Sequence, residues 1–183
     1  NYKYTEGENT TVLTVAKMSS AVNVTANNIK FGEEAVINIA VPNVSLGVAT
    51  VVVNGKSYNV AIVDEKGVLN IYNLAAGDYN VDVTYLGDNK YLSSTNAANF
   101  TVSKVSDYNM TVDIADIVKG ENATITVSVP EDGTGNVIVT INGTDYKGTV
   151  VNGTAKVIIP GLDEGSYKVV TFYTGDNKYD SMV

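Results

Sequence analysis

The stretch LAAGDYNVDVTYLGDNKY at residues 74–91 returns as LDEGSYKVVTFYTGDNKY at residues 162–179. An offset of 88 residues relates the two stretches, and the same offset aligns the rest of both halves without a gap. A fixed period of this kind is typical of a tandem array, in which each repeat is one structural unit. The aligned pairs elsewhere include Gly32 with Gly120, Pro42 with Pro130, Asn54-Gly55 with Asn142-Gly143, and Tyr58 with Tyr146.

The first 17 residues are an additional piece of the same repeat. At an offset of 87, the sequence LTVAK at 13–17 matches FTVSK at 100–104. We therefore interpret residues 1–17 as the closing strand of a preceding repeat, residues 18–104 as the first repeat, and residues 105–183 as a second repeat that lacks its last strand. In the alternative phasing, residues 1–17 provide the first strand of unit one, and the two units are 1–92 and 93–183.

Alternation of apolar and polar residues predicts strands throughout and no helix. The Asn-Gly pairs at 54–55 and 142–143 predict tight hairpins, because both central residues of a type I′ turn need a positive φ. Short strands separated by turns predict an all-β fold in which each repeat is a two-sheet sandwich. The strands expected in the first repeat span 20–26, 35–41, 48–53, 57–63, 67–72, 78–86 and 97–104, and those of the second repeat follow 88 residues later.

An LxxGxY motif in each repeat ends at Tyr79 and Tyr167. Immunoglobulin-like domains carry a tyrosine near the start of the sixth strand, and its hydroxyl bonds to backbone a few residues upstream. The position two residues later belongs to the core, and here it holds Val81 or Val169. The sequence therefore predicts two tandem immunoglobulin-like antiparallel β-sandwiches, with both tyrosines in structural roles.

The composition argues against several classes of function. The chain has no Cys, His, Arg or Gln, which removes thiol nucleophiles, imidazole bases and the usual zinc ligands. We therefore expect no enzyme and no catalytic residue. A net charge of −8 opposes binding to nucleic acid, which needs clustered cations. No apolar run approaches the roughly 20 residues that span a bilayer, so direct membrane insertion is not expected.

The string LxxGxYxVxVxYxGDNKYxxSxxxxxFTVSK, from Leu74 to Lys104, resembles the closing half of bacterial Ig-like (Big) repeats. The Asn-rich, Val-rich and Arg-free composition resembles the repeats of adhesin-like surface proteins of methanogenic archaea. The resemblance covers essentially the whole chain. It implies an extracellular module at the cell surface, acting as an extended stalk or spacer and in adhesion, from a larger anchored protein. The implied partners are neighbouring repeats of the same chain and surface glycans or proteins of host or bacterial cells.

Two other functions stay open at this point. A carbohydrate- or protein-binding module would use the loops of one repeat to hold a ligand. An accessory domain of a cell-wall-active enzyme is a more remote alternative, since nothing in the repeat pattern indicates a paired acid or a cleft.

The repeated Gly-Asp-Asn-Lys loop is the candidate site. Asp88 and Asp176 could bind calcium, but one carboxylate and one amide provide fewer than the roughly six to eight oxygens that calcium takes. The structural interpretation is favoured, in which Gly87 and Gly175 adopt a positive φ and the aspartates bond local backbone amides. We expect no cofactor, with calcium as the minor alternative.

Asn-x-Ser/Thr triplets are frequent along the chain. An exported protein could carry glycans on them, although a sequence rich in Asn and Thr also forms such triplets by chance. The candidate glycosylation sites are Asn9, Asn23, Asn43, Asn99, Asn109, Asn122, Asn142 and Asn152.

Two features of the repeat boundaries suggest chemistry or assembly. Lys17 and Lys104 occupy matching positions, and an isopeptide bond to a nearby Asn96 or Asn99 is one interpretation. A lysine that discourages edge-to-edge pairing is the commoner one. The unmatched ends also suggest strand-mediated self-association, in which residues 10–17 of one molecule complete the second repeat of another. If the unit begins with this strand, both halves are complete without exchange.

Overall fold

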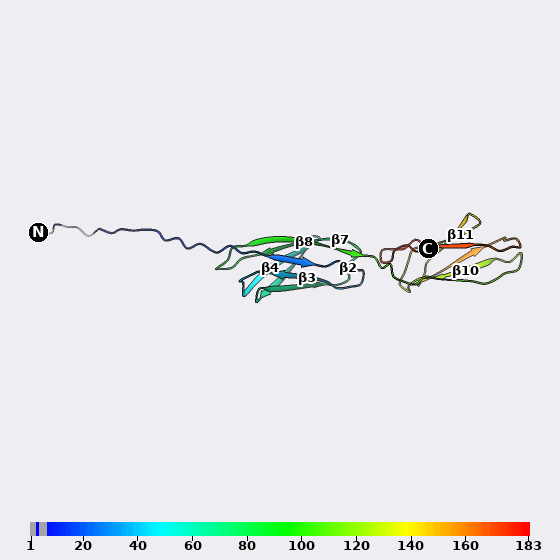
Figure 1. Cartoon of the computed structure of the whole chain (residues 1–183), viewed down its shortest axis with the longest axis horizontal. Coiled ribbons are helices and arrows are strands. Elements are labelled where there is room, and N and C mark those ends of the chain that lie inside the picture. Colours follow the sequence, from blue (N-terminus) through cyan, green and yellow to red (C-terminus); the bar gives the residue numbers. More distant parts are fainter. Residues whose placement is uncertain (1–2, 4–6) are drawn as a thin grey trace. The chain divides into compact units, whose positions relative to one another are not determined.

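The computed structural model describes Lys3 and residues 7–183, and within that part it contains strands and no helix. The predicted class, all-β with tandem immunoglobulin-like sandwiches, is thereby confirmed (Figure 1). Residues 1, 2 and 4–6 of the predicted segment 1–17 lie outside the described residues. Residues 7–17 are exposed and form no strand.

The first sandwich is built from the strands before residue 104. Their hydrogen-bonded order is β1-β3-β6-β5-β4-β7-β8-β2. Because β5 and β6 pair only at Val63 and Lys66, beside the turn that joins them, the strands form two layers, β1-β3-β6 and β5-β4-β7-β8-β2. The bounds are β1 (Asn23–Ala26), β2 (Ile29–Lys30), β3 (Ala35–Ala40), β4 (Leu46–Val53), β5 (Lys56–Val63), β6 (Lys66–Ile71), β7 (Gly77–Tyr85) and β8 (Ser94–Ser103).

The second sandwich repeats most of this plan. Its two sheets have the orders β13-β10-β9 and β12-β11-β14, which correspond to β6-β3-β1 and β5-β4-β7. Three strands, β9, β10 and β13, begin and end 88 residues after their counterparts β1, β3 and β6. The bounds are β9 (Thr111–Ile114), β10 (Ala123–Ser128), β11 (Asn136–Ile141), β12 (Thr144–Thr149), β13 (Thr154–Ile159) and β14 (Val169–Tyr173).

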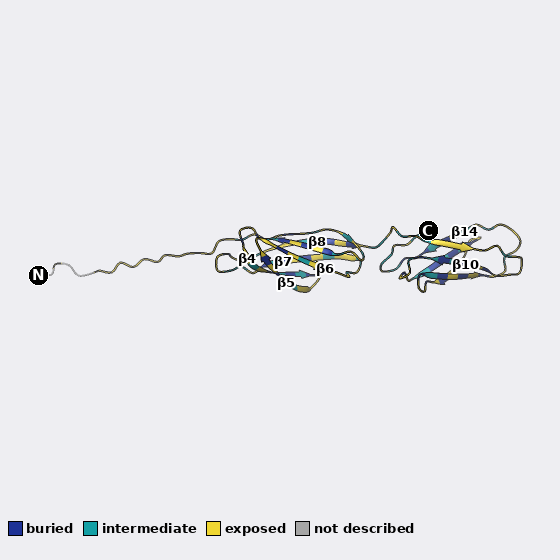
Figure 2. Cartoon of the chain, turned by 90° about the horizontal axis from the view of Figure 1, so that it is seen from below, coloured by how far each residue is buried: buried dark blue, intermediate teal, exposed yellow. Residues whose placement is uncertain are grey.

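Each sandwich buries the inward side chains of its strands, which Figure 2 shows as alternating dark and light bands. In β3 and β10, every second residue is buried, as the alternation predicted. Tyr85 and Tyr173 are the largest fully buried side chains, each with no exposed surface. The cores are otherwise mainly Val and Ile, which suit a pleated surface packed on one side.

Tight turns with a positive φ set the strand register. Asn54 and Gly55 have φ of 44° and 85°, and Asn142 and Gly143 have φ of 48° and 76°, as type I′ hairpins require. The turn at 64–65 joins β5 to β6 with the same positive φ at both positions, although it contains no glycine or asparagine. The strands predicted at 57–63 and 67–72 left this position for a turn, although Asp-Glu is not one of the usual residue pairs of such a hairpin.

The two sandwiches differ at one edge. In the first, β8 lies between β7 and β2, and β2 pairs with it in parallel through Ile29 and Val102. In the second, Met182 matches the first residue of β8 and forms an antiparallel bridge with Tyr173 of β14, but none of the described residues occupies the rest of the position of β8. The segment 117–118, which matches β2, is not a strand, and β14 begins four residues later than the start of β7 predicts.

Candidate functional site

The repeated loop follows β7 in the first sandwich and β14 in the second. Gly87 has a φ of 78° and Gly175 a φ of 70°, in the left-handed region that favours glycine. A Cβ atom on Gly87 would lie 2.9 Å from the Tyr91 carbonyl oxygen, and one on Gly175 would lie 2.6 Å from the Tyr179 carbonyl oxygen. Both positions therefore require glycine for conformation and for space.

Asp88 organises the first loop through hydrogen bonds. Its Oδ1 accepts from the amides of Lys90 at 2.7 Å and Tyr91 at 2.6 Å. Its Oδ2 accepts from the hydroxyl of Tyr85 at 3.1 Å. The amides of Tyr91 and Lys90 stabilise the carboxylate and hold the pKa of Asp88 below its ordinary value. The aspartate therefore fixes the loop onto the buried end of β7.

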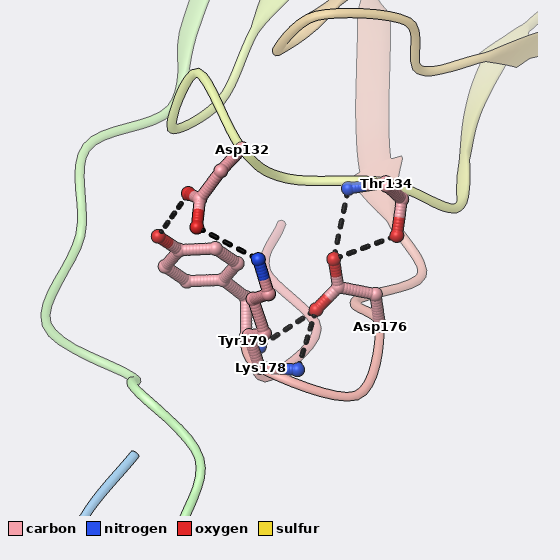
Figure 3. A network of polar contacts seen from close by, with 5 residues as sticks. All are labelled: Asp132, Thr134, Asp176, Lys178 and Tyr179. Atoms are coloured by element: carbon pink, nitrogen blue, oxygen red, sulfur yellow. Dashed lines mark hydrogen bonds and ion pairs between the residues drawn. The ribbon is translucent and has the colours of Figure 1, made fainter. Parts of the chain in front are cut away.

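Asp176 plays the same part in the second loop with more partners (Figure 3). Its Oδ1 accepts from the amides of Lys178 at 2.7 Å and Tyr179 at 2.8 Å. Its Oδ2 accepts from the amide and the hydroxyl of Thr134, at 2.8 and 2.9 Å. Burial alone would raise the pKa of Asp176, but the hydrogen bonds from Lys178, Tyr179 and Thr134 outweigh it and lower the pKa.

A second carboxylate, Asp132, is part of this network, and the first sandwich has no equivalent of it. Both of its contacts in the network are with side chains (Figure 3). Its Oδ1 accepts from the hydroxyl of Tyr179 at 2.7 Å, and its Oδ2 forms an ion pair with Lys178 at 2.9 Å. The hydrogen bond to Asp132, helped by burial, raises the pKa of Tyr179 to about 12. Burial is the main reason that the pKa of Tyr173 is also raised to about 12.

These contacts define what the loop can do chemically. Both oxygens of Asp88 and of Asp176 already accept hydrogen bonds, so a cation would have to displace protein donors. Among the described residues, no group of three or more acidic, His or Cys side chains is placed to hold a metal ion. The loop is therefore organised as a closed hydrogen-bond network, and whether calcium binds elsewhere on the chain stays a prediction.

The first residues of each sandwich also pair with the polar loop of the same sandwich. Met18 forms a parallel bridge with Tyr91, and Val105 forms the matching bridge with Tyr179. The preceding lysines bind the same loops: the Nζ of Lys17 donates to the Asp88 carbonyl, and the Nζ of Lys104 donates to the Asp176 carbonyl.

These lysine contacts bear on the isopeptide hypothesis. One of the suggested partners, Asn96, donates its Nδ2 to the Val22 carbonyl at 2.9 Å. In the structure both lysines therefore hold loop carbonyls, and the isopeptide bond stays a prediction.

Tyr79 and Tyr167 make the contact expected of the immunoglobulin-like corner. The hydroxyl of Tyr79 donates to the Ala75 carbonyl at 2.9 Å, and that of Tyr167 donates to the Asp163 carbonyl at 2.8 Å. In both cases the acceptor lies four residues upstream. The ring of Tyr79 also stacks on Phe100 of β8, with centroids 5.2 Å apart and planes inclined by 12°.

The second sandwich has a groove where the first has β8. The cavity has a volume of about 640 Å³. Its lining includes Ile125 and Ile141 from the core, the partly buried Ile117, Tyr167 and Val169, and the charged residues Asp116, Lys119, Asp163 and Glu164. The core residues beneath the groove are buried all the same, with Ile125 at 0% and Ile141 at 4% exposed.

The predicted glycosylation sites are accessible. All eight asparagines, Asn9, Asn23, Asn43, Asn99, Asn109, Asn122, Asn142 and Asn152, are exposed. Asn142 and Asn152 each open a tight turn with a positive φ, so their side chains are also explained by turn geometry. Modification of these residues stays a prediction.

The network around Asp132 and Thr134 was not predicted from the sequence. The positions that match them in the first repeat are Val44 and Leu46, so the repeat comparison carried no polar signal there. The hydroxyl of Tyr173 donates to the Thr134 carbonyl at 2.6 Å, whereas Tyr85 bonds to Asp88. The hydroxyl of the buried tyrosine therefore finds a hydrogen-bond acceptor in both repeats, but a different one in each.

Comparison with known proteins gives structural likenesses only. No protein-family model and no curated protein sequence matches the chain. The fibronectin(III)-like modules of CbhA from Clostridium thermocellum are similar with a TM-score of 0.39 and 12% identity, over 88% of this chain and 89% of that one. A bacterial ice-binding adhesin gives a TM-score of 0.38 and 15% identity, over 92% of this chain and 62% of that one. The fibronectin-III array of RIM-binding protein gives 0.33 and 17%, over 87% and 59%.

Likenesses this weak carry no argument about what the chain does, so its class rests on its own strand order and tyrosine corners. In the described part of the chain, no helix has the length and apolar character needed to cross a membrane.

Proposed function

We propose that this chain is a pair of structural spacer modules from a cell-surface protein, with no catalytic activity. The supporting observation is that the repeated polar loop is committed to internal hydrogen bonds in both copies. Asp88 and Asp176 bond backbone amides, and Lys17 and Lys104 bond loop carbonyls. A tandem array of units that contact mainly their neighbours can project a distant domain without binding a ligand itself.

The more specific form of the proposal follows the resemblance to bacterial Ig-like repeats of adhesin-like proteins from methanogenic archaea. An extracellular position is consistent with the exposure of all eight candidate glycosylation sites. Adhesion would then be carried by other parts of a larger anchored protein, while these sandwiches set its reach.

Two experiments test this role. Antibodies raised against residues 18–183 should label intact cells of the source organism, and labelling only after lysis would contradict a surface position.

The purified chain should bind no glycan on a carbohydrate array and no protein on the surface of neighbouring cells. Saturable binding that is lost when a surface loop is replaced would instead support the carbohydrate- or protein-binding alternative.

A further inference from the structure

An apolar patch lies on the outer face of the first sandwich, on the layer β5-β4-β7-β8-β2, whose closing strand β8 is in place. The patch comprises two residues of β4, two of β5 and the residue after β7: Leu46, Val48, Ala61, Val63 and Leu86. Leu46 pairs with Val63, and Val48 pairs with Ala61. The amide of Leu86 donates to the Val48 carbonyl at 3.2 Å. The five residues are therefore neighbours across three strands.

The patch is open to solvent although its strands are apolar. Leu46 is 72% exposed, Leu86 55%, Val63 52% and Val48 43%, whereas Ala49 of the same strand faces the core with no exposed surface. A strand with one face in water usually alternates apolar and polar residues, but β4 reads LGVATVVV, with a threonine as its one polar side chain. A run this apolar is typical of a strand that is covered on both faces.

The repeat fold itself does not require the patch. In the second sandwich, four of the five matching positions carry polar residues and one is a valine: Thr134, Asn136, Thr149, Thr174 and Val151. The hydroxyl of Thr134 donates to Asp176, and that of Thr174 accepts from the Asn136 amide at 3.1 Å. The same sheet position is therefore polar and internally hydrogen-bonded in one copy of the repeat and apolar in the other. Packing within a sandwich does not explain the patch.

We propose that two copies of this chain associate side by side through this patch, with the outer faces of their β5-β4-β7 strands in contact. A two-fold axis brings the same surface of each copy onto the other, so one self-complementary patch is sufficient. Antiparallel sheets pack face to face at about 10 Å with their strands nearly aligned, as the two layers of a sandwich do. The contact goes beyond the spacer role, which a single copy can fulfil.

Charge favours a second copy as the occupant of the patch. The segments that form it, residues 46–50, 59–63 and 84–86, contain no charged side chain. A partner that placed a charged group there would bury it without a counterion, which is unfavourable. A second copy instead brings the same aliphatic and uncharged polar side chains. Asp64 and Glu65 directly follow the β5 segment, and in a pair they add to the repulsion between two chains of net charge −8. Screening by salt should therefore strengthen the contact.

The size of the face predicts a weak contact. The strand β4 has 8 residues. With neighbouring strands about 4.8 Å apart and a rise of about 3.3 Å per residue, three strands give a face of roughly 400 Å². Two copies would bury roughly twice this area, which is below the roughly 1,200 Å² of stable complexes. We therefore expect a pair that separates in dilute solution and forms when copies are concentrated side by side.

Nuclear magnetic resonance of the isotope-labelled 183-residue chain, over a range of concentrations up to about 1 mM, tests the proposal. The expected result is a set of amide shifts that change with concentration and belong to β4, β5 and β7. Added salt should move the midpoint of these changes to lower concentration, because it screens the repulsion between the acidic chains. The opposite response to salt would show that ion pairs hold the copies together and would overturn the proposal.

Two variants exchange patch residues for those of the second sandwich. Leu46→Thr and Leu86→Thr introduce the residues found at the matching positions, Thr134 and Thr174. Each should weaken association at least about tenfold, because it removes an exposed aliphatic side chain from both copies at once. Val68→Thr is the matched control, since Val68 is also 55% exposed but belongs to β6 of the other layer. Threonine suits exposed strand positions, and spectra at low concentration report whether each variant keeps its fold.

A single spin label shows which faces meet. The chain contains no cysteine, so Ser57→Cys, at an exposed position of β5, gives one attachment point for a nitroxide beside the patch. When this copy is mixed with an isotope-labelled copy, it should broaden the amide signals of residues 46–50 and 59–63 in that copy. The proposal is overturned if the spectra do not change up to about 1 mM, if Val68→Thr weakens association as much as Leu46→Thr, or if the broadening falls outside the β5-β4-β7 face.

Discussion

The first and second sandwiches share their core pattern, their hairpins, their tyrosine corners and their polar loops, yet one is closed by β8 and the other is open. In the first, β7 extends from Gly77 to Tyr85, whereas its counterpart β14 begins only at Val169. The strand β2 exists in the first and is absent from the matching segment of the second. Two features therefore accompany the closing strand β8, namely the full length of β7 and the presence of β2.

The comparison separates what each repeat can form alone from what it needs the closing strand to form. The inner strands β3, β4 and β6 have equivalents in β10, β11 and β13, and all of them carry buried residues at alternate positions. Those strands bury enough apolar surface to order without β8. The edge elements bury less. Val24 of β1 is 9% exposed, but Val112 of β9 is 42% exposed.

The largest effect is expected from Phe100→Ala. Removing a buried aromatic ring typically costs about 3–5 kcal/mol, and here it also removes the stacking on Tyr79. The first sandwich should lose this stability, while the second should keep its own. Urea unfolding monitored by residue-resolved NMR would separate the two. Leu13→Ala is the matched control at the same repeat position and should leave both transitions of the monomer unchanged.

The next largest loss of stability is expected from substitution of a glycine in the polar loop. Gly175→Ala should destabilise the second sandwich by about 2–3 kcal/mol, because it combines an unfavourable φ with a close contact to the Tyr179 carbonyl. Gly120→Ala is a control for conformation alone, since its φ is 96° and a Cβ atom at this position would meet nothing within 4 Å. It should cost about 1 kcal/mol. Equal losses in the two variants would show that the close contact is unimportant.

Alkaline pH should affect the second sandwich more than the first. The pKa of Tyr173 and that of Tyr179 are about 12 in the folded chain, against an ordinary value of 10.0. A raised pKa means that the folded state holds the proton more tightly. This stabilisation is therefore complete below about pH 10 and is lost as the pH rises toward about 12. Unfolding midpoints measured across this range should fall more steeply for the second sandwich.

Tyr179→Phe provides the control for that pH dependence. It removes one of the two hydroxyls whose pKa is about 12, together with its bond to Asp132, so the fall with pH should become shallower. An unchanged slope would mean that the hydrogen bond to Asp132 does not set the alkaline response.

The smallest effect is expected at the tyrosine corners. Tyr79→Phe and Tyr167→Phe each remove one hydrogen bond to an upstream carbonyl and retain the ring, which should cost about 1 kcal/mol. The two losses should be similar, because the hydrogen bond of each corner is made to a carbonyl four residues upstream and not to β8. Chemical denaturation of the single variants would measure both. A cost confined to Tyr79→Phe would mean that the corner needs the closing strand to form.

Much of the fold could be predicted from the sequence because its determinants are local. Alternation located the inner strands, and Asn54-Gly55 and Asn142-Gly143 located hairpins that need a positive φ. The short strand β2 was not predicted, since it depends on pairing with β8. The turn at 64–65 was located by the strands predicted on either side of it, although it lacks the usual residues.

The candidate site also has a part that the sequence predicted and a part that it did not. The roles of Gly87 and Asp88 follow from a repeated local loop, and a bond from aspartate to nearby amides is a local property. The contacts of Asp132 with Tyr179 and Lys178 join segments far apart in the sequence and occur in one repeat only. Repeat comparison could not reveal them, because it detects what the two copies share.

Hydrogen exchange of the matching edge segments tests most directly the claim that β8 orders the edge at which the two sandwiches differ. At low concentration, amides in 77–80 should exchange slowly and those in 165–168 rapidly. When residues 96–104 are added after Val183, both segments should exchange slowly. Equal protection of the two segments in the unmodified monomer, or no gain of protection in the extended variant, would contradict the account.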